Sequence, residues 1–354
     1  MSIIISAKTS FPKHEYSQEE LSHFLGTIHP KNSDAIKRIF KNALVAKRRL
    51  SLPLEIYKNL AGLELRNNHW QETAMKLQIQ NLEYFFEDLK FPLEDISIIF
   101  STTITGLSIP SIEAKLMNLF PFSKKTKRVP IFGLGCLGGV SLVARAHDYL
   151  VAYPKEAVLI LATELCSLTF QINDFNMSNI IGTSLFADGA GAIIMVGDEH
   201  PWKIKGSYQI CASESSFFPN TERVMGWDIV DQGFKLVLSG DVPKIVSDHL
   251  IPSMNHFLQS NKLSVEDIKF YISHPGGPKV LYAIEESLNL STDQLALSYE
   301  SLKDHGNMSS VSVINVLERS INHVKKKSKC LQRYGMMLAM GPAFCSEIVL
   351  VKEI

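Results

Sequence analysis

The chain has 354 residues, of which 45% are hydrophobic and 20% charged, and its 36 basic side chains balance its 36 acidic ones. This composition is typical of a globular protein, and a neutral chain lacks the basic surplus with which nucleic-acid-binding proteins displace counterions. No apolar run reaches the roughly 20 residues of a membrane span, and no basic segment precedes the short apolar stretch at the start. We therefore expect a cytoplasmic protein without a membrane span, a signal peptide or a nucleic-acid partner.

Five cysteines are spread along the chain, and none belongs to a C-x-x-C pair. An odd number at wide spacing predicts neither a disulfide framework nor a thiolate zinc site. Each cysteine is either a small buried apolar residue or a reactive thiol. They are Cys136, Cys166, Cys211, Cys330 and Cys345.

The predicted elements begin with helices between residues 17 and 80. Ser17 followed by Glu20 is a helix-capping pattern, and apolar residues recur at helical spacing between 36 and 44. Strands and helices then alternate, as parallel βαβ units require. The predicted strands are 96–101, 129–133, 157–163, 268–273, 336–340 and 347–351, and the predicted helices are 111–119, 140–151, 278–288 and 311–321.

This alternation occurs twice, on either side of a long connection at 198–265, and no Pro/Gly/Ser-rich linker divides the chain. The order favours one large α/β fold made of two similar halves over two independent domains. We place an N-terminal half, with its helical region, at 1–220 and a C-terminal half at 221–354. A basic run at 325–329 is expected to be a solvated loop.

The first candidate for chemistry is IFGLGCLGG at 131–139, a predicted strand end followed by a Gly-rich turn that opens a helix. As G-x-G-x-x-G it predicts a dinucleotide site with Glu164 as the ribose-binding acid, although Glu164 lies later than the usual ~20 positions. Alternatively, Cys136 is a nucleophile, because the positive end of a helix dipole lowers a thiol pKa and flanking glycines admit a substrate. The motif alone also allows Cys136 to be a buried turn residue.

Two further turns carry candidate side chains. His274 lies in SHPGGPKVL at 273–281 and Asn307 in HGNMSSVSV at 305–313, each before a predicted helix. Functional residues collect in such loops of α/β folds, although an isolated Asn is usually a cap or turn residue. With Cys136 the set is chemically complete: a thiolate accepts an acyl group, and an imidazole N–H and an amide N–H hold an oxyanion. This set predicts carbon–carbon bond formation.

These motifs resemble those of the type III polyketide synthases, the chalcone-synthase-like branch of the thiolase superfamily. The similarity begins near residue 95, and four motifs occur in the family's order. They are GLGCLGG, IGTSLFADGAGA at 181–192, SHPGGP and GNMSS. The resemblance implies an α/β thiolase-like fold with duplicated βαβαβ units in αβαβα layers. One motif departs from the family, because its Gly-Phe-Gly-Pro-Gly loop reads Ala-Met-Gly-Pro-Ala at 339–343, which changes the expected cyclisation pocket.

The resemblance assigns roles to the candidate residues. Cys136 would hold the starter and the growing polyketide as a thioester, and His274 would keep Cys136 ionised. His274 and Asn307 would bind the thioester carbonyl of malonyl-CoA during decarboxylation, beside the gatekeeper Phe186. The scheme uses acyl-CoA and malonyl-CoA as substrates and needs no metal, flavin or other cofactor and no acyl carrier protein. The family also implies a homodimer.

Other positions are assigned to the cavity and to coenzyme A. The resemblance places five further residues around the substrate, with Leu236 at a second gate where plant-type enzymes carry an aromatic residue and Ile109 toward the other subunit. These cavity residues are Thr105, Ile109, Gly182, Leu236 and Ser309. Coenzyme A phosphates require cations, and the candidates are Lys37, Arg38 and Lys41, although the family's own basic positions align with apolar residues here. Core packing and a solvated helix face are the respective alternatives.

The sequences around these motifs are more similar to those of the bacterial enzymes of the family, several of which accept long acyl chains. We therefore expect a fatty acyl-CoA starter and an alkylpyrone or alkylresorcinol-type product. Three alternatives stay open: a short-starter aromatic polyketide synthase, another thiolase-superfamily condensing enzyme of the ketoacyl synthase kind, and a non-catalytic or dinucleotide-binding protein.

Overall fold

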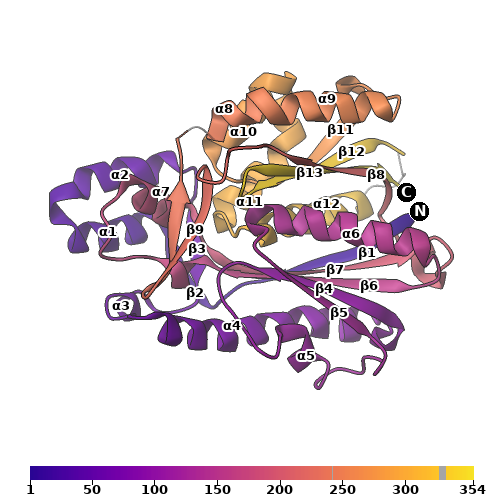
Figure 1. Ribbon diagram of the computed structural model, residues 1–354, viewed down its shortest axis with the longest axis horizontal. Coiled ribbons are helices and arrows are strands. Elements are labelled where there is room, and N and C mark those ends of the chain that lie inside the picture. Colours follow the sequence, from indigo (N-terminus) through magenta and orange to yellow (C-terminus); the bar gives the residue numbers. More distant parts are fainter. Residues whose placement is uncertain (241, 327–331) are drawn as a thin grey trace.

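A computed structural model describes residues 1–240, 242–326 and 332–354 (Figure 1). The strands are β1 (Ser2–Ser10), β2 (His14–Ser17), β3 (Lys47–Leu50), β4 (Ile96–Thr103), β5 (Lys127–Phe132), β6 (Ala157–Leu165), β7 (Asp188–Gly197), β8 (Tyr208–Phe217), β9 (Met225–Val230), β10 (Gly233–Leu238), β11 (Ile268–Ser273), β12 (Tyr334–Gly341) and β13 (Cys345–Glu353). The α-helices are α1 (Gln18–Ile28), α2 (Ser33–Asn42), α3 (Leu54–Tyr57), α4 (Leu63–Glu83), α5 (Ile112–Leu116), α6 (Gly138–Ala152), α7 (Met177–Leu185), α8 (Val242–Ile245), α9 (Ile251–Ser260), α10 (Pro278–Leu288), α11 (Ala296–His305) and α12 (Ser310–Lys325).

The main sheet is mixed and runs β11-β12-β13-β8-β1-β7-β6-β4-β5. β4 pairs in parallel with both β5 and β6, so α5 and α6 are the crossover helices that such pairing requires. β6 and β7 are buried along their whole length, which explains why their sequences are continuous apolar or small-residue runs without alternation. The pairing of β8 with β13 joins the half at 1–220 to the half at 221–354.

The molecule has five layers. Figure 1 shows α6 and α12 between two groups of strands, with α4 and α5 outside one group and α8 to α10 outside the other. The central core is formed by apolar residues of these two helices and of the strands on both sides. Because α6 is covered on both faces, it is apolar nearly all round. This is the αβαβα arrangement expected of a thiolase-like fold.

Most elements expected from the sequence are confirmed. The strand at 268–273 and the helix at 278–288 have the same bounds in the structure, and Ser17 caps α1 with Glu20 in a reciprocal capping box. The helix expected at 111–119 is shorter, because α5 ends at Leu116. Of the loop expected at 325–329, residues 327–329 lie outside the described residues.

Two expectations are corrected. The region 17–80 is not wholly helical, since it contains β3, and the connection expected at 198–265 contains, in its described residues, three strands and two α-helices. β8 has a polar, partly exposed sequence, which lacks the apolar run that marks a central strand. β9 and β10 pair with each other in a separate hairpin. β1, at the centre of the sheet, was also not expected. No helix of the described residues is long and apolar enough to cross a membrane.

Candidate active site

Cys136 lies in a short 3-10 turn, Gly135–Leu137, between β5 and α6. Gly133 and Gly135 have φ values of 99° and 54°, in the left-handed region where glycine is favoured. A Cβ at Gly135 would also come within 2.8 Å of Pro342, and one at Gly139 within 2.4 Å of the Ser310 carbonyl oxygen. The glycines are therefore required to place the turn against the Pro342 ring and α6 against the Ser310 backbone, whether or not a nucleotide binds.

The acidic residue of the dinucleotide interpretation is engaged elsewhere. Glu164 is fully buried at the end of β6 and accepts hydrogen bonds from the hydroxyls of Ser310 (2.8 Å) and Thr105 (3.0 Å). It also accepts one from the backbone N–H of Ile104 (3.2 Å). A carboxylate enclosed in this way is not available to a ribose, so the arrangement favours Cys136 as the functional residue of the motif.

His274 follows β11 and is 6% exposed. Its backbone N–H donates to the Leu338 carbonyl oxygen at 2.8 Å, which fixes the residue to β12. Neither ring nitrogen has a hydrogen-bond partner among the described residues. Buried polar atoms are usually paired, so an imidazole with both nitrogens unpaired is suited to meeting a substrate.

Asn307 connects the His274 turn with the Cys136 turn. Its Nδ2 donates to the Gly276 carbonyl oxygen at 3.0 Å, and a Cβ built on Gly276 would lie 3.5 Å from the His274 ring. Its Oδ1 accepts from the Ser309 backbone N–H at 2.8 Å, and the Ser309 side chain hydrogen-bonds to Cys136. Three segments far apart in the sequence therefore meet in one place.

Burial disfavours charge on both reacting side chains. It raises the pKa of the Cys136 thiol to about 12, with the Ser309 hydrogen bond opposing the shift and Glu164 adding to it. It also lowers the pKa of His274 to about 3. Neither group is charged on its own at neutral pH, so a thiolate would form only with transfer of its proton to the imidazole. Ionisation of Cys136 by His274, which the resemblance implies, stays a prediction.

The burial of Glu164 also shifts the pKa of its carboxyl. Burial raises the pKa of its carboxyl to about 7, although hydrogen bonds from Ser310, Ile104, Thr105 and Ser309 oppose the shift. This carboxyl therefore titrates near neutral pH, next to the candidate nucleophile.

Replacing Glu164 with glutamine is expected to flatten the pH dependence of stability. The folded protein holds the carboxyl proton up to a pKa of about 7, whereas the usual value is 4.5. This contribution is therefore present below pH 4.5 and is lost as pH rises through 7, a fall of about 3 kcal/mol in the free energy of unfolding. Urea unfolding at several pH values should show this fall in the unsubstituted protein and in the exposed control Glu94→Gln. An equal fall in Glu164→Gln would contradict the assignment.

The predicted gate residues form one cluster. A Cβ at Gly182, in α7, would come within 2.3 Å of Leu236 Cδ2 and 3.4 Å of Phe186 Cδ2. Trp227 pairs with Leu236 across the β9–β10 hairpin, and its ring centroid is 6.1 Å from that of Phe186. The structure thus brings Gly182, Phe186 and Leu236 together. It adds Trp227, which the sequence analysis missed because it placed 198–265 in a connection.

Arg48 is a second residue that the sequence analysis missed. It is fully buried and donates to the carbonyl oxygens of Thr183 (2.6 Å) and Phe186 (2.7 Å). Phe186 also forms a bridge with Asn307, whose carbonyl oxygen accepts from Ala187. Arg48 therefore fixes the backbone that carries Phe186 beside Asn307. A basic residue in a KRR run gives no sequence signal for such burial.

The other predicted residues lie apart from this cluster. Thr105 is buried and bonds to Glu164, whereas Ile109 is 99% exposed. Lys37, Arg38 and Lys41 are exposed on α2. Their roles at the cavity wall, the subunit interface and the coenzyme A phosphates stay predictions.

The layered fold and the convergence of a cysteine, a histidine and an asparagine define an acyl-transferring condensing enzyme. The models of the chalcone and stilbene synthase family match residues 1–199 with its N-terminal domain and residues 209–354 with its C-terminal domain. The chain belongs to this family and is a type III polyketide synthase.

Similar proteins agree with this family. A chalcone synthase-type protein of Bacillus subtilis is 40% identical over 99% of this chain and 98% of its own. A 1,3,6,8-tetrahydroxynaphthalene synthase of Streptomyces peucetius is 35% identical over 99% and 92%. An alpha-pyrone synthesis polyketide synthase-like protein of Mycobacterium tuberculosis is 25% identical over 98% and 90%. The crystal structure of a 1,3,6,8-tetrahydroxynaphthalene synthase from Streptomyces coelicolor, described as a bacterial type III polyketide synthase, superposes with a TM-score of 0.92 at 26% identity, covering 99% of both chains.

Proposed function

We propose that this polyketide synthase loads an acyl group from an acyl-CoA onto Cys136 and extends it with malonyl-CoA. The sulfur attacks the thioester carbonyl, the bond from acyl carbon to coenzyme A breaks, and the thiol proton passes to His274. Loss of carbon dioxide leaves an electron pair on the malonyl-derived unit as an enolate. Its carbon attacks the acyl group, and Cys136 departs. The observation that carries the proposal is the chain of contacts from Cys136 through Ser309 and Asn307 to Gly276 beside His274.

The two polar donors, His274 and Asn307, and the apolar gate residue, Phe186, have different roles in the reaction. An imidazole N–H of His274 and the Asn307 amide stabilise the enolate oxygen, as fixed donors in a water-poor site do. Phe186 is 9% exposed and lies beside Asn307, so its ring disfavours the malonyl carboxylate and favours its loss. The half at 1–220 supplies the nucleophile and the half at 221–354 supplies both donors. No step needs a metal, a redox cofactor or an acyl carrier protein.

We further propose a long-chain fatty acyl starter and an alkylpyrone or alkylresorcinol-type product. Leu236 places an aliphatic side chain at the gate, against Gly182, and the relative named for alpha-pyrone synthesis supports cyclisation to a lactone. The runner-up is a short-starter enzyme that forms an aromatic product. It is supported by the relatives named as tetrahydroxynaphthalene synthases and by Trp227, whose bulk narrows the same gate.

The starter is identified by mass spectrometry of products formed from malonyl-CoA with palmitoyl-CoA, hexanoyl-CoA or no starter. Preference for palmitoyl-CoA, with masses of two or more extensions, supports the proposal, whereas an aromatic product from malonyl-CoA alone supports the runner-up. Leu236→Phe is expected to lower kcat/KM for palmitoyl-CoA about tenfold relative to hexanoyl-CoA, because a phenylalanine ring is larger than the leucine side chain and crowds the space at Gly182. An unchanged ratio would remove Leu236 from the gate.

We propose that the enzyme is a homodimer formed through the edge of the sheet. β5 is one of the two edge strands of the main sheet, and an unpaired edge is a template for another strand. Large apolar side chains stand exposed near it, including Phe132 (52%), Leu107 (44%) and Ile109 (99%). Light scattering is expected to give the mass of two chains, and Phe132→Glu should shift it toward one. A single-chain mass for the unsubstituted protein would contradict this interface.

A further inference from the structure

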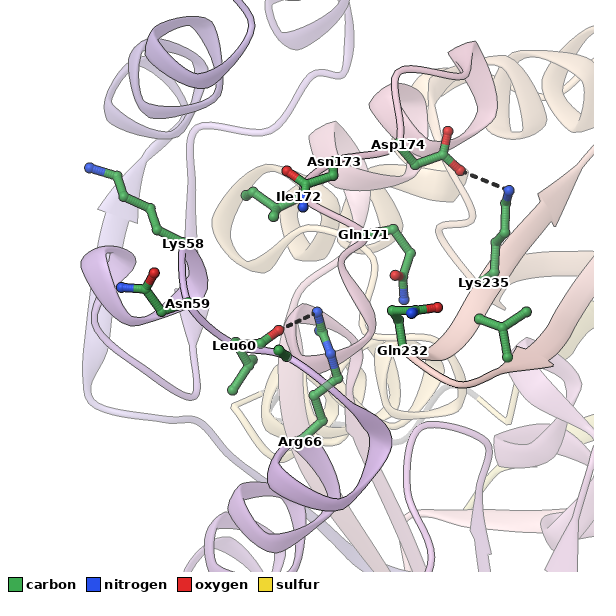
Figure 2. Close-up of a pocket in the computed structure, with 12 residues that line it drawn as sticks. Lys58, Asn59, Leu60, Arg66, Gln171, Ile172, Asn173, Asp174, Gln232 and Lys235 are labelled. Carbon is green, nitrogen blue, oxygen red and sulfur yellow. Dashed lines mark hydrogen bonds and ion pairs between the residues drawn. The ribbon is translucent and has the colours of Figure 1, made fainter.

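A large pocket lies behind the β9–β10 hairpin, and none of the candidate catalytic residues lines it. It has a volume of about 800 Å³ and is bounded by the segment before α4, the segment 171–174 and the tip of the hairpin (Figure 2). This volume is in the range of small-molecule sites, which is roughly 300–1,000 Å³. The lining residues with charged side chains are Lys58, Arg66, Asp174 and Lys235, and those with amide side chains are Asn59, Gln171, Asn173 and Gln232.

The charged lining residues leave a positive excess, with three cations facing one carboxylate. Lys235 Nζ lies 3.2 Å from Asp174 Oδ2, and Lys58 Nζ lies 2.7 Å from Glu55, whose side chain is 75% exposed. Lys58 Nζ also lies over the Phe24 ring, 5.4 Å from its centroid, and Figure 2 shows it directed away from the pocket. Lys235, whose side chain is 43% exposed, is therefore the lysine that a ligand in the pocket would reach.

Arg66 is the buried cation among the residues that line the pocket. It is 6% exposed, and its guanidinium donates to the carbonyl oxygens of Leu168 (2.7 Å) and Leu60 (2.8 Å). Its Nε has no hydrogen-bond partner, and no carboxylate of the described residues pairs with it. Figure 2 shows the side chain extending between Leu60 and Gln232 into the pocket. A buried charge that meets only carbonyl oxygens is costly, and an anion in the pocket would compensate it.

Neutral donors surround the same space. Figure 2 shows the side chains of Gln171 and Gln232 next to each other, with Asn59 and Asn173 farther out. The Gln171 amide already donates to the carbonyl oxygens of Thr169 (3.2 Å) and Phe234 (3.3 Å), so Gln232 rather than Gln171 is left to donate to a ligand. Amide N–H groups beside a guanidinium are suited to carboxylate or phosphate oxygens. Leu60, Ile172 and Val230 supply apolar surface for a carbon skeleton.

We propose that this pocket is a second ligand site, which binds an organic anion carrying two or more carboxylate or phosphate groups. Lys235 lies on the hairpin wall, near Gln232 and Arg66, whereas Lys58 lies on the opposite wall with its ammonium directed outward. A ligand with separated anionic groups fits this arrangement, whereas a single small anion reaches only part of it.

The ligand would contact the hairpin that also carries the gate. Successive side chains of a strand point to opposite faces, so Lys235 faces the pocket while Leu236 faces Gly182. Trp227 lies across from Leu236 on the gate face. Occupancy of the pocket therefore acts on the position of Trp227 without touching the acyl chain.

Isothermal titration calorimetry of the full chain tests the site with citrate for carboxylates and pyrophosphate for phosphates. We expect one equivalent of at least one anion to bind, with Kd near or below about 1 mM at low salt. Lys235→Met should weaken binding about tenfold, as the loss of one charge contact does. Lys58→Met, which removes an ammonium that points away from the pocket, and Lys76→Met, on the exposed face of α4, should not. Binding should also change the tryptophan fluorescence, and this change should disappear in Trp227→Phe.

The outcomes separate the possible ligands and do not depend on catalysis, so a failure here is distinct from a failure of the proposed function. Binding of citrate alone assigns the site to carboxylates, and binding of pyrophosphate alone assigns it to phosphates. The proposal is wrong if neither anion binds, or if Lys235→Met binds as the unsubstituted protein does. It is also overturned if coenzyme A displaces the anion, because the pocket would then hold the substrate. A fluorescence change that survives Trp227→Phe would exclude the effect on the gate. The Lys235 side chain is 43% exposed, so its replacement tests the site even if Arg66 variants do not fold.

Discussion

Replacing Cys136 with alanine is expected to abolish the acyl-enzyme and to lower polyketide formation at least about 10⁴-fold, because a missing nucleophile is not replaced by the remaining groups. Mass spectrometry of the intact protein after exposure to an acyl-CoA should show the acyl mass on the unsubstituted enzyme and none on the variant. Decarboxylation of malonyl-CoA should persist, since it depends on His274 and Asn307, which the substitution leaves in place.

The matched control is Cys211→Ala, because Cys211 is an exposed free cysteine on β8. Its acyl adduct and product yield should equal those of the unsubstituted enzyme. An adduct that survives in Cys136→Ala, or one that disappears in Cys211→Ala, would place the nucleophile elsewhere. Loss of decarboxylation together with acylation in Cys136→Ala would mean that the turn, rather than the sulfur alone, had been disturbed.

The sequence predicted those parts of the fold and site that depend on local rules. The Gly-rich turn around Cys136 is required by backbone conformation, since Gly133 and Gly135 both have positive φ. The strand at 268–273 and the helix at 278–288 follow from an apolar run and a proline at the first helical turn. Candidate residues at three turns could thus be identified, because a turn next to a strand end has a recognisable composition.

The remaining features depend on contacts between distant segments. β1 occupies the centre of the sheet only because β7 and β8 flank it, and its nine residues alone do not distinguish a central strand from an apolar terminus. Glu164 matches a ribose-binding acid in spacing, yet its surroundings of Ser310 and Thr105 come from two other segments. Arg48 is basic and would be assigned to the surface, but the carbonyl oxygens at the end of α7 bind it in the interior.

Replacing Asn307 with alanine is expected to separate decarboxylation from acyl loading. The variant loses the Nδ2 donor, so stabilisation of the enolate oxygen should fall and malonyl-CoA decarboxylation should slow about 10²–10³-fold, as removal of one oxyanion donor does. Acylation of Cys136 should continue, because the substitution removes neither the sulfur nor His274. Rapid-quench mass spectrometry of the acyl-enzyme and release of labelled carbon dioxide measure the two steps separately.

A buried asparagine on the following helix provides the control. Asn315 is 4% exposed, but its amide donates to Thr9, away from Cys136, so Asn315→Ala perturbs packing without removing a donor from the site. It should decarboxylate malonyl-CoA at nearly the unsubstituted rate, even if its melting temperature falls. Equal losses of decarboxylation in both variants would indicate a structural effect. A normal decarboxylation rate in Asn307→Ala would leave His274 as the donor that matters, because neither of its ring nitrogens has a hydrogen-bond partner in the part of the chain that the structure describes.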